Sequence, residues 1–181
     1  MPLNPEVRNK IYRYSSILKF ANQIAMVLIP LGLIVLWLFA DKLPPNLMNH
    51  QFGVADYKFG PLTKLLGILV SLIPSTVTFL LFFNTSKLFA LYQKGEILLE
   101  KNVRCFKSIG FLFIIKTITD FLVIPLYAII LTMYNGPGNC RLSLSLNSEH
   151  LTSLASGIFL MIVAWVIDEA RKANEELELT I

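Results

Sequence analysis

The stretch IGFLFIIKTITDFLVIPLYAIILTM, residues 109–133, decides the fold, because only two of its residues, Lys116 and Asp120, are charged. An α-helix needs about 20 mostly apolar residues to cross the hydrocarbon core of a bilayer, and this stretch is long enough. Three more apolar blocks occupy about residues 20–40, 65–83 and 151–168. The sequence therefore predicts four transmembrane helices.

The composition argues against a water-soluble globular protein. Of the 181 residues, 55% are hydrophobic and 15% are charged, whereas soluble domains carry about 25% charged residues. A chain of this length has no residues left over to bury four apolar helices. We expect an all-α membrane protein, a four-transmembrane-helix bundle in which residues 1–181 form a single domain. We expect no cleaved signal peptide, because residues 1–19 are mostly polar and no small-x-small cleavage site follows Ala40.

The positions of lysine and arginine predict the orientation, since cytoplasmic segments are enriched in both residues. Most of the 16 lie in three segments that four spans place on one side: residues 1–19, the loop 84–108 and the tail after residue 168. The opposite side holds Lys42, Lys58, Lys64 and Arg141. We therefore expect both termini in the cytoplasm. This rule also accounts for the basic net charge without a nucleic-acid partner.

The segment before the first span has the pattern of a helix. Asn4 can cap it and Pro5 suits its first turn. Val7, Ile11 and Leu18 fall on one apolar stripe. Such a helix either lies on the inner membrane surface, where it would attract anionic lipid, or extends the first span inward.

The two loops on the outer side carry strand signals. QFGVADYKF, residues 51–59, has aromatic residues and a glycine as punctuation, and RLSLSL, residues 141–146, alternates polar and apolar residues. The two loops together predict a small extracytoplasmic β-structure.

The loop between spans two and three predicts a cytoplasmic hairpin, residues 84–108. Helix two should continue past the membrane and end at Gly95, which accepts a left-handed cap, and Asn102 should cap the next helix. The hairpin serves either as a docking surface for a cytoplasmic partner or as a self-packed element that fixes helix register. The candidate docking residues are Leu88, Tyr92, Lys94, Gly95 and Asn102.

This loop, with four spans and a terminal ELTI, resembles the bacterial integral membrane proteins grouped as domain of unknown function family 2975. The signature residues are Leu88, Phe89, Tyr92, Gly95, Ile97, Asn102, Val103, Ile109, Gly110, Leu179, Thr180 and Ile181. The tail reads NEELELTI, longer than the family's compact NELTI ending. The resemblance implies a four-span protein of the bacterial inner membrane with no established activity. It also implies a neighbouring gene for a small helix-turn-helix regulator.

Lys116 and Asp120 are four residues apart, so a helix places them on one face, where they can pair. A charge at mid-membrane costs about 2.5–3.5 kcal/mol on insertion scales. Charges inside spans are often functional, which makes this pair the candidate polar site for a substrate or proton path. The alternative is an internal ion pair that only fixes helix packing.

Three prolines, Pro30, Pro74 and Pro125, fall inside spans and are candidate helix kinks. Kinks here would open a central cavity or be plain bends. Near the start of the first span, Asn22 and Gln23 are expected to form hydrogen bonds between helices rather than to bind substrate.

No sequence motif indicates catalysis, a cofactor or a metal. His50, Cys140, Glu149 and His150 lie on the outer side and are zinc-ligand types, but they lack motif spacing and are better explained as scattered loop residues. Phosphate loops, zinc-protease helices and nucleophile elbows are absent. We expect neither a cofactor nor an enzyme.

These observations favour a non-enzymatic membrane protein with a regulatory or sensory role. Its partners would be the lipid bilayer and, from the family context, a cytoplasmic helix-turn-helix regulator that contacts the hairpin. One alternative is a small transporter or channel-like protein that uses Lys116 and Asp120. A second alternative is an immunity or membrane-stress factor.

Overall fold

The computed structural model describes residues 5–42, 59–97, 99–134 and 147–179. Within these ranges the chain forms helices and no strand. They are α1 (Pro5–Leu38), the short 3-10 helix η1 (Ala40–Lys42), α3 (Pro61–Gln93), α4 (Glu100–Thr132) and α5 (Ser148–Leu179). The four α-helices are each long and apolar enough to cross a membrane, which confirms the predicted fold class. The β-structure predicted for the outer loops falls on residues outside the described ranges.

Each helix is longer than the apolar block that predicts it. At a rise of 1.5 Å per residue, the 33 residues of α3 span about 50 Å, more than the ~30 Å of hydrocarbon. The first helix runs from Pro5 to Leu38 without a break, so the N-terminal segment extends the first span rather than forming a separate helix. Helices α3 and α4 likewise continue past the apolar blocks and form the predicted hairpin.

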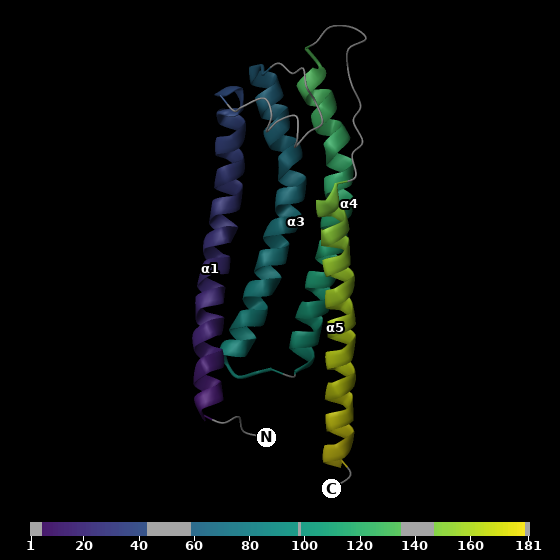
Figure 1. Cartoon of the computed structure of the whole chain (residues 1–181). Coiled ribbons are helices and arrows are strands. Elements are labelled where there is room, and N and C mark those ends of the chain that lie inside the picture. The colour runs from purple at the N-terminus through teal and green to yellow at the C-terminus, as the bar shows by residue number, and fades with distance from the viewer. Residues whose placement is uncertain (1–4, 43–58, 98, 135–146, 180–181) are drawn as a thin grey trace.

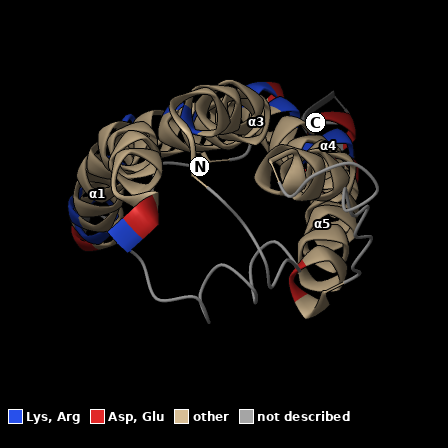
Figure 2. Ribbon diagram, turned by 90° about the horizontal axis from the view of Figure 1, so that it is seen from above, with Lys and Arg blue, Asp and Glu red and all other residues tan. Residues whose placement is uncertain are grey.

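The helices stand in chain order as an open, curved row. Helix α1 packs on α3, α3 on α4, and α4 on α5. Seen from above, α1 and α5 lie at the two ends of an arc, and none of the described helices lies on its concave side (Figure 2). The N- and C-terminal ends and the α3–α4 turn lie at one end of the molecule (Figure 1). We call this end the inner end and the opposite one the outer end, after the orientation that the sequence predicts.

Close contacts at glycine bring neighbouring helices together. At the α4–α5 crossing, a Cβ on Gly110 would lie 2.8 Å from the carbonyl oxygen of Gly157, and a Cβ on Gly157 equally close to that of Gly110. Where α1 meets α3, the Trp37 ring covers Gly67 and leaves no room for a Cβ. Small residues are the usual means of close helix approach in membranes, where the hydrophobic effect does not drive association.

The α3–α4 turn confirms one capping prediction and corrects another. Gly95 has a φ of 77°, and its N–H donates to the Tyr92 carbonyl at 3.0 Å, so it caps α3 in the left-handed conformation as predicted. The prediction that Asn102 caps α4 is wrong, because Leu99 holds that position. Asn102 lies inside the first turn, and its Nδ2 donates back to the carbonyls of Glu96 at 2.7 Å and Ile97 at 3.0 Å.

The prediction for Asn22 is confirmed. Its Nδ2 donates from α1 to two acceptors on α3, the Phe82 carbonyl at 2.6 Å and the Ser86 hydroxyl at 2.5 Å. Gln23, by contrast, is exposed.

Candidate functional site

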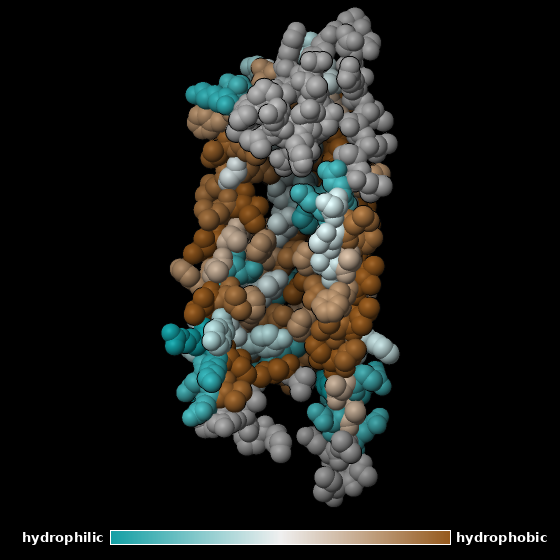
Figure 3. All heavy atoms as spheres, in the orientation of Figure 1, coloured by the Kyte–Doolittle hydropathy of each residue, from teal (hydrophilic) through white to brown (hydrophobic). Residues whose placement is uncertain are grey.

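A cavity of about 700 Å³ opens among the four helices. Its lining comes from residues 32–37 of α1, Ser71 and Pro74 of α3, residues 113–127 of α4 and residues 147–156 at the start of α5. Figure 3 shows this hollowed face, with polar side chains among the apolar surfaces of the helices. Most of the lining residues belong to the outer halves of the helices, and Phe113 and Lys116 lie near the middle of α4, so the cavity extends from the middle of the molecule toward the outer end.

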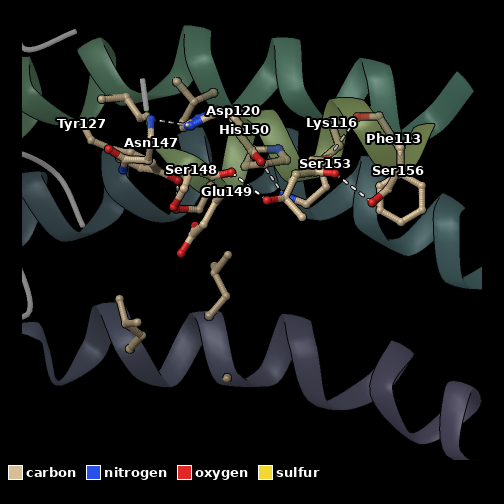
Figure 4. A pocket seen from close by; sticks show the side chains of 18 of the residues that line it. Phe113, Lys116, Asp120, Tyr127, Asn147, Ser148, Glu149, His150, Ser153 and Ser156 are labelled. Carbon is tan, nitrogen blue, oxygen red and sulfur yellow. Dashed lines mark hydrogen bonds and ion pairs between the residues drawn. The ribbon is translucent and has the colours of Figure 1, made fainter. Parts of the chain in front are cut away.

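The predicted pair of Lys116 and Asp120 forms and lies in this cavity. The Lys116 ammonium donates to Asp120 Oδ2. The two side chains are 31% and 27% exposed, so the pair is partly open to the cavity (Figure 4). A paired charge that faces a cavity costs less than a lone charge buried in hydrocarbon.

A second polar feature of the cavity joins three helices at Ser71. The Ser71 hydroxyl donates to the Gly67 carbonyl on its own helix at 2.7 Å. It therefore accepts hydrogen bonds from Trp37 Nε1 of α1 at 2.8 Å and from the Tyr127 hydroxyl of α4 at 2.7 Å. The Trp37 side chain is almost fully buried, so this junction fixes the inward faces of α1, α3 and α4 relative to one another.

The first turns of α5 supply the opposite wall. The prediction that Glu149 and His150 are scattered loop residues is wrong, because both belong to α5 and line the cavity. His150 is buried, and its Nδ1 accepts the Asn147 backbone N–H at 3.2 Å, while the backbone N–H of His150 donates to the Asn147 carbonyl at 3.0 Å. This reciprocal pair resembles a capping box and starts the helix.

Further along α5, Ser153 Oγ donates to the Phe113 carbonyl of α4 at 3.3 Å. Glu149 is exposed and reaches into the open space between α5 and α1 (Figure 4). The cavity therefore holds one ammonium, two carboxylates, an imidazole and several hydroxyls, together with the apolar side chains of Leu33 and Leu36.

The remaining candidate residues lie elsewhere. Leu88 is 5% exposed and Asn102 is fully buried, so both hold the hairpin together and neither can touch a partner. Tyr92 is half-buried, and Lys94 is exposed at the turn.

Of the prolines, Pro74 lines the cavity and Pro30 lines a smaller groove between α1 and α3, whereas Pro125 is half-buried in α4. The zinc-ligand types His50 and Cys140 lie outside the described residues. In the ranges that are described, no three histidine, cysteine, aspartate or glutamate side chains gather as metal ligands would.

The fold and the cavity define a multi-pass helical membrane protein with a charged pair accessible inside its spans. The family model described as Protein of unknown function (DUF2975) matches residues 57–181, and the chain belongs to this family. Searches of curated proteins and of solved structures found no match. The family has no established activity, so the cavity itself is the guide to function.

Proposed function

We propose that the protein is a non-enzymatic membrane sensor that binds a small polar ligand in the cavity from the outer side. The observation that carries this proposal is the Lys116–Asp120 pair, which lies in a hollow lined by all four helices, mostly in their outer halves. A pair that served only packing would be expected at a closed helix interface. The two partly exposed side chains instead face open volume.

The size and chemistry of the cavity suit a small dipolar molecule. Ligand cavities are typically about 300–1,000 Å³ and combine apolar walls with a few polar groups, and this one falls in that range. Lys116 would receive an anionic group, and Asp120 or Glu149 a cationic one. Leu33 and Leu36, which line the cavity and are only partly buried, would cover the apolar part of the ligand. A zwitterion carries both charges and is the class that matches best.

Helix α4 connects the cavity to the inner end, which is why we favour a sensor. Lys116 and Asp120 lie on this helix, and its inner end packs under the hairpin through Asn102. There Lys107 pairs with Asp168 of α5 at 3.2 Å, and Asp168 also pairs with Arg171. A ligand that shifts α4 against its neighbours would change the surface around exposed Lys94, where a cytoplasmic helix-turn-helix regulator would bind.

A small transporter is the second candidate, since charges inside spans commonly mark substrate paths. It needs a route from the cavity to the inner end, whereas a sensor needs none. Uptake therefore separates the two candidates.

Thiol labelling tests whether the cavity is open to water from outside. In a background with Cys105→Ser and Cys140→Ser, Ser153→Cys and Ser156→Cys should react in intact cells with a charged, membrane-impermeant thiol reagent. Ile158→Cys and Phe159→Cys, on exposed apolar positions of the same helix, are the matched controls and should stay unlabelled. Equal labelling of both pairs, or of neither, contradicts an outward-open cavity.

Ligand binding is then tested with the purified full chain and a panel of zwitterions, amines and carboxylates. A binder should raise the thermal unfolding temperature of the wild type, and Lys116→Leu/Asp120→Leu should abolish that rise. The same compound should change binding of the regulator to the wild type, and Lys94→Glu should weaken that binding. Accumulation of the compound in proteoliposomes would favour the transporter, and no response to any member of the panel counts against the cavity as a ligand site.

A further inference from the structure

A second hollow of about 430 Å³ lies in a groove between α1 and α3, toward the inner end. It shares no lining residue with the central cavity. Two lysines, Lys19 of α1 and Lys87 of α3, line it, and none of its lining residues is acidic. The groove is therefore a positively charged site that the proposed sensing function does not use.

The two lysines stand at the level where lipid headgroups are expected. Lys87 is six residues before the end of α3 at Gln93, which is about 9 Å along the helix. Lys19 Nζ donates to the Gln93 side chain at 3.3 Å, which places it close to the same helix end. Both ammonium groups thus lie near the inner membrane surface rather than in its centre.

The rest of the groove is apolar and extends toward the middle of the membrane. Phe83 and Phe79 lie one and two turns outward from Lys87, with ring centroids 6.5 Å apart and planes 9° from parallel. Lys87 Nζ lies 4.3 Å from the centroid of the Phe83 ring. Met26 and Val27 of α1 face the same groove. The groove is cationic at the membrane surface and apolar below it. An anionic lipid has a negative headgroup at the same level and apolar chains below it, so the two are complementary.

We propose that this groove binds one anionic phospholipid, with its phosphate near Lys19 and Lys87 and an acyl chain along Phe83 and Phe79. Charge complementarity selects the headgroup, and the aromatic wall selects a membrane lipid over a soluble phosphate. The lipid would also join α1 to the rest of the molecule. Because α1 stands at the end of the row and packs mainly on α3, a ligand shared by α1 and α3 adds to the contact that holds α1 to the rest of the molecule.

The test uses purified full-length protein and measures lipid retention by native mass spectrometry. Phosphatidylglycerol should be retained in preference to phosphatidylcholine with the same chains. Lys19→Gln and Lys87→Gln should each weaken the binding of phosphatidylglycerol about 5-fold, the weight of one basic residue at an anionic surface, and leave phosphatidylcholine unchanged. The matched controls are Lys10→Gln on α1 and Lys94→Gln at the end of α3. Both lysines are exposed, and neither lines the groove.

Two further arms distinguish a bound lipid from a bound soluble anion and from a folding defect. Phe79→Ala should weaken retention of phosphatidylglycerol, whereas inorganic phosphate should not stabilise the wild type against heat. Lys19→Arg and Lys87→Arg keep the charge and should retain the lipid, which covers the case in which the glutamine variants do not fold. The proposal is overturned if the control variants lose as much lipid, if both lipids bind equally, or if phosphate alone stabilises the protein.

Discussion

At the scale of single residues, Lys116 and Asp120 make the clearest energetic prediction. Lys116→Leu leaves a carboxylate without its partner, at a cost of up to about 3 kcal/mol, reduced because Asp120 is partly exposed. Asp120→Leu should cost less, since the long lysine side chain can reach toward the inner surface. The double leucine variant removes both charges and should be close to wild type in stability. Thermal or denaturant unfolding in detergent measures all three.

The control is another pair with the same spacing on the same helix. Glu100 and Arg104 form an ion pair four residues apart, with side chains 58% and 75% exposed, so replacing either should change stability by less than about 1 kcal/mol. If the double Lys116 and Asp120 variant is less stable than both single variants, the pair contributes net stability and the argument from desolvation is wrong.

Asn102 is the second residue whose substitution should lower the stability of the protein. Its buried amide donates to two turn carbonyls, and Asn102→Ala removes both hydrogen bonds. We expect destabilisation of about 1–3 kcal/mol, together with faster proteolysis at the turn. Lys101→Ala, one residue earlier and exposed, should leave both measurements unchanged. Wild-type resistance to protease in the Asn102 variant would show that the turn is held by other contacts.

At the scale of elements, glycines set the helix spacing. Gly110→Ala or Gly157→Ala drives a Cβ into the facing backbone, which neither helix can relieve by a rotamer change. Overpacking of this kind costs about 1–3 kcal/mol, and it should also lower the unfolding temperature. Gly32→Ala is the matched control, since its Cβ would meet nothing within 4 Å, and it should be neutral or slightly stabilising. Equal effects at all three positions would argue that helix propensity, not packing, is measured.

Features within one element are predictable from the sequence. The lengths of the apolar blocks predict the four spans, Gly95 predicts the end of α3, and the spacing of Lys116 and Asp120 predicts their contact. Tyr127 lies two turns after Asp120 on the same face of α4. This spacing could have been used to predict that Tyr127 belongs to the same polar site as Lys116 and Asp120.

Features that depend on how helices meet are not predictable in this way. The Ser71 junction joins residues from three helices, and the Gly110–Gly157 contact joins two, so neither leaves a periodic trace in any one segment. The cap prediction for Asn102 fails because the sequence does not show where an asparagine side chain near a helix start will point. A capping asparagine accepts hydrogen bonds from the N–H groups of the helix, whereas Asn102 donates to carbonyls of the preceding turn. The loop prediction for Glu149 and His150 fails because polar residues near a helix start resemble those of a loop.

At the scale of the whole molecule, the open row makes α3 and α4 the interior helices and leaves α1 and α5 as edges. Most of the packing between the long helices is between neighbours in the sequence, so each hairpin can form as it is inserted. The described helices form a curved row (Figure 2), and all four of them line the cavity. Substitutions that flatten the α4–α5 crossing should therefore alter the cavity without touching its polar groups.

Orientation is the property on which an outward-open cavity depends, and it is testable with two exposed lysines. In the cysteine-free background, Lys42→Cys at the outer end should react with an impermeant thiol reagent in intact cells, and Lys94→Cys at the turn only after permeabilisation. The reason is that the end of the molecule with the termini has an excess of lysine and arginine, and segments rich in these residues stay in the cytoplasm. The reverse labelling pattern would leave the fold intact but place the cavity toward the cell interior, so that its ligand would have to be cytoplasmic.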